Sequence, residues 1–138
     1  MTLFEKTDRH VLRATRTRAL VGPVLVGIGI IHIAFTPLFQ PAFGDLLATR
    51  LVGRPASTGL AERAAQESGF WYVVCGAGVL LLGGLAWWAE RQVGTLPAAL
   101  GIGLLVLAFA GLLLGPVTGF WLFLVPGALV LLRRRRAG

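Results

Sequence analysis

Residues 92–132, QVGTLPAALGIGLLVLAFAGLLLGPVTGFWLFLVPGALVLL, contain no Lys, Arg, Asp, Glu or His. As one helix this stretch would be about 60 Å long at 1.5 Å per residue, roughly twice the hydrocarbon thickness of a bilayer. The chain must therefore fold back once. The segment Leu114–Gly119, with its Gly-Pro pair, is the place that breaks a helix and favours a turn. The stretch predicts a transmembrane hairpin that ends at the arginine run 133–136.

The composition agrees with a membrane protein. Of 138 residues, 56% are hydrophobic and 14% are charged, and the mean hydropathy is +0.78. Uncharged runs of this length are too long for core helices of a soluble domain, and the small size predicts one bundle without a second domain. The net charge of +7 lies at the chain ends and beside the apolar runs. It predicts contacts with anionic lipid headgroups and not with nucleic acid.

Four apolar runs predict an all-α, polytopic membrane protein. The four transmembrane helices cover about residues 19–36, 68–89, 95–114 and 117–132. Residues 1–18 form a basic leader, either a short helix in the cytoplasmic headgroup layer or a disordered tail. The long connection 37–67 is expected to hold two short helices, Asp45–Val52 and Leu60–Gln66. A connection of this length is typical of a lid or a binding element.

The basic residues are distributed unequally between the two sides of this bundle. The side with both termini collects ten of the thirteen Lys and Arg residues: Lys6, Arg9, Arg13, Arg16, Arg18, Arg91, Arg133, Arg134, Arg135 and Arg136. The positive-inside rule therefore predicts cytoplasmic termini and an extracytoplasmic loop 37–67, with Trp87 and Trp88 at the inner interface. We expect a multi-pass protein of the bacterial cytoplasmic (inner) membrane.

The two halves of the sequence resemble each other. Ser68-Gly69-Phe70-Trp71 matches Thr118-Gly119-Phe120-Trp121, and Pro23-x3-Gly27-Ile28-Gly29 matches Pro97-x3-Gly101-Ile102-Gly103. Both matches occur in the same order, which indicates an internal repeat. It predicts two tandem hairpins related by a pseudo-two-fold axis along the membrane normal.

The candidate chemistry lies in the first copy of this repeat, where His32 corresponds to Val106 and Glu67 to Val117. An ionisable residue inside a span normally faces the bundle interior or a cavity. Paired with Glu67, His32 could transfer a proton. The alternative is a neutral His32 that bonds a backbone carbonyl or Thr36 and serves only packing. The predicted ligand-binding residues are His32, Gln66, Glu67, Trp71, Tyr72 and Trp121.

The sequence predicts no cofactor and no metal. Bis-histidine haem ligation needs a second intramembrane His, whereas His10 lies on the predicted cytoplasmic side. A single cysteine, Cys75, excludes an internal disulfide, and we expect it to be an inert core residue. The expected partners are membrane lipids, a lipophilic small molecule, and a homo-oligomer or a larger membrane complex.

Two aromatic helix starts, Ser68-Gly69-Phe70-Trp71 and Pro116-Val117-Thr118-Gly119-Phe120-Trp121, carry a family resemblance. With the four-helix pattern they resemble small bacterial membrane proteins of the domain-of-unknown-function type, and loosely the DoxX-like group. The resemblance implies an architecture and no catalytic role.

Three functions follow as hypotheses. The first is a binder of a lipophilic small molecule or an accessory subunit of a membrane complex, acting through an outer-leaflet cavity and loop 37–67. The second is a compact membrane enzyme, an isomerase or cyclase of a lipid-like substrate, that uses Glu67 and His32 as an acid–base pair. The third is an oligomeric small transporter.

Overall fold

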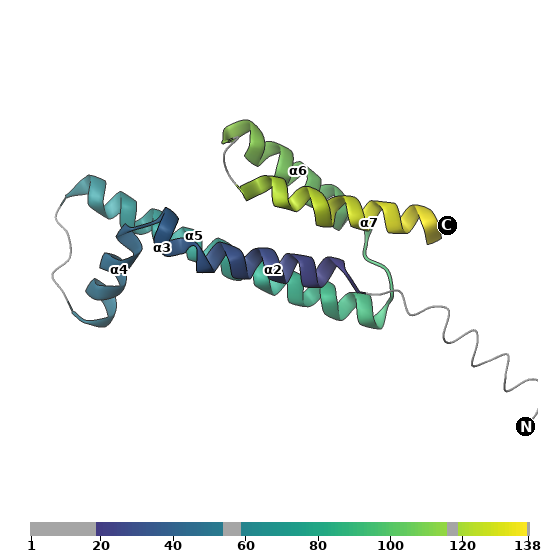
Figure 1. Cartoon of the computed structure of the whole chain (residues 1–138), viewed down its shortest axis with the longest axis horizontal. Coiled ribbons are helices and arrows are strands. Elements are labelled where there is room, and N and C mark those ends of the chain that lie inside the picture. The colour runs from purple at the N-terminus through teal and green to yellow at the C-terminus, as the bar shows by residue number, and fades with distance from the viewer. Residues whose placement is uncertain (1–18, 54–58, 116–118, 138) are drawn as a thin grey trace, which may run out of the picture. The chain divides into compact units, whose positions relative to one another are not determined.

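The computed structural model describes residues 19–53, 59–115 and 119–137, without the side chains of residues 136 and 137. Every element in this part of the chain is a helix, which confirms the all-α prediction. In order they are α2 (Val21–Ala34), α3 (Thr36–Phe39), α4 (Ala42–Leu51), α5 (Leu60–Gln92), α6 (Ala98–Leu114), η1 (Gly119–Phe123) and α7 (Leu124–Ala137) (Figure 1). The predicted leader helix and the turn residues Pro116–Thr118 lie outside the described residues.

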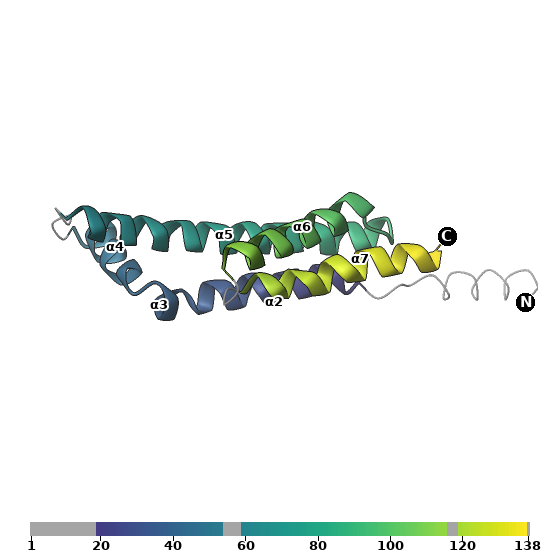
Figure 2. The same ribbon diagram turned by 90° about the horizontal axis from the view of Figure 1, so that it is seen from above.

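Helix α5 is the longest of these elements (Figure 2). It has 33 residues, which correspond to about 50 Å at 1.5 Å per residue. The sequence predicted a short helix, Leu60–Gln66, followed by a separate span from Ser68. The structure joins them into one helix. The residues at the junction, Gln66 to Gly69, include no proline, and a single glycine inside a helix costs only about 1 kcal/mol. Among the described residues, α5 alone is both long and apolar enough to cross a bilayer.

The other apolar helices are shorter than their predicted spans. Helix α2 has 14 residues and α6 has 17, which correspond to about 21 and 26 Å, against about 30 Å of bilayer hydrocarbon. Helix α6 ends at Leu114 with Gly115 as its C-cap, so the predicted break is confirmed in its described part. Helix α3 begins with Pro37 in its first turn, where proline needs no N–H partner. The four-span topology stays a prediction.

The chain forms two compact units, divided between residues 24 and 25 and between 83 and 84. In the unit of residues 25–83, glycines bring α2 and α5 close together. A Cβ atom added to these glycines would lie 2.6–2.7 Å from atoms of the facing helix. Three layers pair a glycine with a larger residue: Val26 with Gly83, Gly29 with Leu80, and Ile33 with Gly76. Steps of three and four residues along both helices are those of an antiparallel coiled-coil contact.

The other unit contains a second hairpin, α6 with η1 and α7, which lie side by side and antiparallel (Figure 1). The buried face of α6 consists of small residues and one leucine: Gly101, Leu104, Ala108 and Gly111. Gly101 lies against Val130 and Gly127 against Leu105, and Gly111 lies beneath the Phe120 ring. The hairpin predicted from residues 92–132 is therefore present, and it is packed through glycine like the α2–α5 pair.

The glycines that the predicted repeat aligns do not share an environment. Gly29 and Gly101 are packed against the facing helix, whereas a Cβ atom on Gly27 or Gly103 would meet nothing within 4 Å. The alignment pairs Gly27 with Gly101 and Gly29 with Gly103, so each pair joins an open position to a packed one. Two residues on a helix differ by about 200° in direction, so a Gly-x-Gly motif does not specify which glycine is packed. The duplication and its symmetry axis stay predictions.

Neighbouring glycines provide a matched test of this packing. Gly83→Ala places a methyl group 2.6 Å from the backbone nitrogen of Val26, and we expect it to lower the free energy of unfolding by about 1–3 kcal/mol. Gly84→Ala meets nothing within 4 Å, and we expect a gain of up to about 1 kcal/mol because alanine favours helix. Denaturant unfolding in detergent micelles, followed by helical circular dichroism, measures both. Effects of the same sign would contradict the packing.

Candidate functional site

His32 lies near the end of α2, and its ring is held by α5. Its Nε2 atom lies 3.1 Å from the backbone carbonyl oxygen of Tyr72, and the two rings stack with centroids 3.9 Å apart and planes 13° apart. Because a carbonyl oxygen only accepts, Nε2 carries a proton in this bond. Gly76 makes the approach possible, since a Cβ atom there would lie 3.0 Å from His32 Cδ2. The hydroxyl of Thr36 donates to the carbonyl of His32 at 3.3 Å.

Of the predicted site residues, the structure brings His32 and Tyr72 into contact. The side chain of Glu67 is exposed and makes no hydrogen bond or ion pair with another described residue. Gln66 is buried on α5, whereas Trp71 on α5 and Trp121 on η1 are exposed. Cys75, expected in the core, is also exposed on α5. The His32 contact matches the packing alternative of the sequence analysis, a histidine bonded to a backbone carbonyl.

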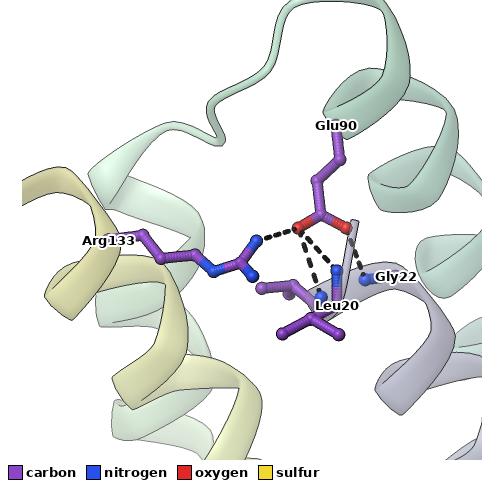
Figure 3. A network of polar contacts seen from close by, with 5 residues as sticks. Leu20, Gly22, Glu90 and Arg133 are labelled. Carbon is purple, nitrogen blue, oxygen red and sulfur yellow. Dashed lines mark hydrogen bonds and ion pairs between the residues drawn. The ribbon is translucent and has the colours of Figure 1, made fainter. Parts of the chain in front are cut away.

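A second polar cluster, which the sequence analysis missed, surrounds Glu90 near the end of α5 (Figure 3). Only 5% of Glu90 is exposed. Its Oε1 accepts from the backbone N–H groups of Leu20 and Val21 at 3.2 Å each, and its Oε2 accepts from that of Gly22 at 2.9 Å. Nη1 of Arg133, on α7, donates to Oε1 at 3.2 Å. We call these five residues the Glu90 network.

The start of α2 explains why a carboxylate lies there. The first N–H groups of a helix have no partner within the helix, and the helix dipole favours a negative charge at this end. Ala19 and Leu20, which precede α2, have no side chain that could cap it. Gly22 lies so close to α5 that an added Cβ atom would overlap Trp87. Glu90, one turn beyond Trp87, therefore reaches the free N–H groups and caps α2 from another helix.

The Glu90 network contains two residues whose roles the sequence analysis did not predict. Glu90 is the one acidic residue after Glu67, and it lies on the predicted side that is rich in arginine. An acid in that position signals a specific partner. Arg133 belongs to the arginine run 133–136, for which contacts with lipid headgroups were predicted, but its side chain is 33% exposed and paired with Glu90. Arg134 and Arg135, the next two residues of the run, are exposed.

Together these features define a small protein that is all-helical and packed through glycine in its described residues, one helix of which has membrane-spanning length. The chain belongs to the family of unknown function DUF6463, whose model matches residues 16–137. This membership agrees with the predicted domain-of-unknown-function type, while the likeness to the DoxX-like group stays a prediction. Neither the curated proteins nor the solved structures include a match to this chain.

The Glu90 network predicts that replacing Glu90 lowers the free energy of unfolding strongly, whereas replacing Glu67 leaves it almost unchanged. Glu90→Gln removes the charge that three backbone N–H groups and Arg133 share, and we expect the free energy of unfolding to fall by about 2–4 kcal/mol. Glu67→Gln, at an exposed position, should change it by less than about 0.5 kcal/mol. Denaturant titration in micelles compares them. Equal losses for the two variants would show that Glu90 does not cap α2.

Proposed function

We propose that this chain is a multi-pass protein of the bacterial cytoplasmic membrane that serves as a non-catalytic accessory subunit of a membrane complex. The observation that carries the proposal is the exposure of α5. Its most apolar 18-residue window is only 22% buried inside the fold. The core helix of a soluble protein would be mostly buried, whereas a helix that faces lipid or a partner helix would not.

The outward side of α6 supports the same location. Large apolar side chains are exposed along most of this helix: Ile102, Val106, Leu107, Phe109, Leu113 and Leu114. Its inward side consists of three small residues and Leu104, and small residues at a helix contact are expected for helices that pack within a bilayer. Such a surface is suited to contact with lipid tails or with the apolar faces of other membrane helices.

Helix lengths suggest how the four spans would fit the bilayer. Helix α5 exceeds about 30 Å of hydrocarbon, so its first turns would extend beyond the membrane on the side of the 37–67 loop. Helices α2 and α6 are shorter, and a bilayer adapts to short helices by local thinning. The arginine distribution supports cytoplasmic termini.

The contacts favour an accessory subunit over an enzyme or a transporter. The Nε2 atom of His32 is bonded to the backbone carbonyl of Tyr72, and no described contact joins His32 to Glu67. Glycine layers fill the space between paired helices. Helix faces, and the 37–67 segment, would then carry the interaction with partners.

Cysteine labelling tests the topology. In a Cys75→Ser background, we expect Asp45→Cys to react with a membrane-impermeant maleimide in intact spheroplasts. Gln92→Cys should react only after permeabilisation, because it lies on the predicted cytoplasmic side. Both positions are exposed, so burial does not limit either reaction. Extraction of the chain by alkaline carbonate, or labelling of both variants in intact spheroplasts, would overturn the proposal.

A double-mutant cycle tests the absence of an acid–base pair. We expect the unfolding free energies of His32→Gln and Glu67→Gln to add within about 0.5 kcal/mol, because no contact joins the two side chains. The matched cycle of Glu90→Gln with Arg133→Gln should show a clear interaction energy, since that pair is bonded. Coupling between His32 and Glu67 as large as in the second cycle would support the enzyme hypothesis instead.

A further inference from the structure

A hollow of about 220 Å³ lies on one face of α5 and is lined by Gly84, Trp87, Trp88 and Arg91. Their spacing places them on one side of the helix over two turns, a length of about 10 Å. A Cβ atom on Gly84 would meet nothing within 4 Å, so the end of the hollow is open. Along the helix the lining residues are a glycine, then two tryptophans, then an arginine. The polarity of the hollow therefore increases from its Gly84 end to its charged Arg91 end.

The positively charged end of the hollow is held in a defined place. The guanidinium carbon of Arg91 lies 4.8 Å from the centre of the Trp87 ring, a cation–π contact. The close approach of Gly22 to Trp87 fixes this part of α5 against α2. A guanidinium that stacks on a ring keeps its in-plane N–H groups available, and these match the oxygen atoms of a phosphate.

The charge of Arg91 has no compensating carboxylate among the described residues. Its neighbour Glu90 is engaged by the backbone of α2 and by Arg133. A ligand that complements this end of the hollow is therefore an anion. Trp88, which is 62% exposed, and the exposed Leu85 on the same helix supply the apolar surface for the rest of such a ligand.

We propose that this hollow binds one anionic phospholipid of the cytoplasmic leaflet, with its phosphate at Arg91 and an acyl chain along Trp88 and Gly84. The inference rests on the membrane location proposed above. The apolar end of the hollow distinguishes a lipid from free phosphate, which would use only Arg91. The uncompensated charge favours an anionic headgroup over a zwitterionic one, whose cation Arg91 repels.

Tryptophan quenching by brominated lipids tests the site in the full-length chain. Trp71→Phe and Trp121→Phe leave Trp87 and Trp88 as the reporters, and both replaced residues are exposed. In vesicles, brominated phosphatidylglycerol should quench at lower mole fraction than brominated phosphatidylcholine, by about fivefold, the factor typical of one arginine at an anionic membrane surface. Arg91→Gln should remove this preference. Gly84→Leu, which fills the hollow, should weaken quenching by phosphatidylglycerol.

Two matched controls and one competitor complete the experiment. Arg134→Gln removes another exposed arginine, and Gly103→Leu enlarges another open glycine, so both should keep the preference. Equal quenching by the two lipids, unchanged by Arg91→Gln or Gly84→Leu, would overturn the lipid site and leave the membrane location standing. Absence of quenching by either lipid would instead refute the membrane location. Loss of the preference in inorganic phosphate at constant ionic strength would identify a free-phosphate site and overturn the inference.

Discussion

The close approach of helix backbones at glycine is the constraint on which the other contacts depend. Gly76 leaves room for His32 to reach the Tyr72 carbonyl, and Gly22 brings the start of α2 near enough for Glu90 to cap it. A side chain at either glycine would separate the helices and leave both polar groups without these partners. Glycine thus contributes twice, through van der Waals contact and through access to backbone hydrogen-bonding groups. The second contribution explains why two ionisable side chains are tolerated in so apolar a chain.

The two ionisable groups take opposite kinds of backbone partner. His32 donates to a carbonyl oxygen in the middle of a helix, whereas Glu90 accepts from N–H groups at the start of one. In both cases the polar side chain satisfies a group on another helix, which fixes the relative position of the two helices at that point.

Much of the fold could be predicted from the sequence, because local signals determine it. The uncharged run and its Gly-Pro break give the α6–α7 hairpin. The continuity of α5 could not be predicted, since the polar residues Glu67 and Ser68 resemble the start of a helix. In the structure the helix continues through them, and the next residue, Gly69, packs on Phe43. Glu90 was missed for a related reason: its partners are distant in sequence, and only the spatial approach at Gly22 reveals them. Periodicity cannot show such contacts.

The order Glu90-Arg91 follows from the antiparallel arrangement of α2 and α5. An acid near the C-terminal end of α5 is disfavoured by the dipole of its own helix, but the N-terminus of α2 supplies the opposite field at the same place. Glu90 is therefore stabilised only when α2 lies beside α5 in this direction. The positive charge of Arg91, near the C-terminal end of α5, is stabilised by the dipole of α5 itself, so it requires no carboxylate partner within the protein. One residue of the pair consequently fixes the hairpin, while the other stays free to meet an anion outside it.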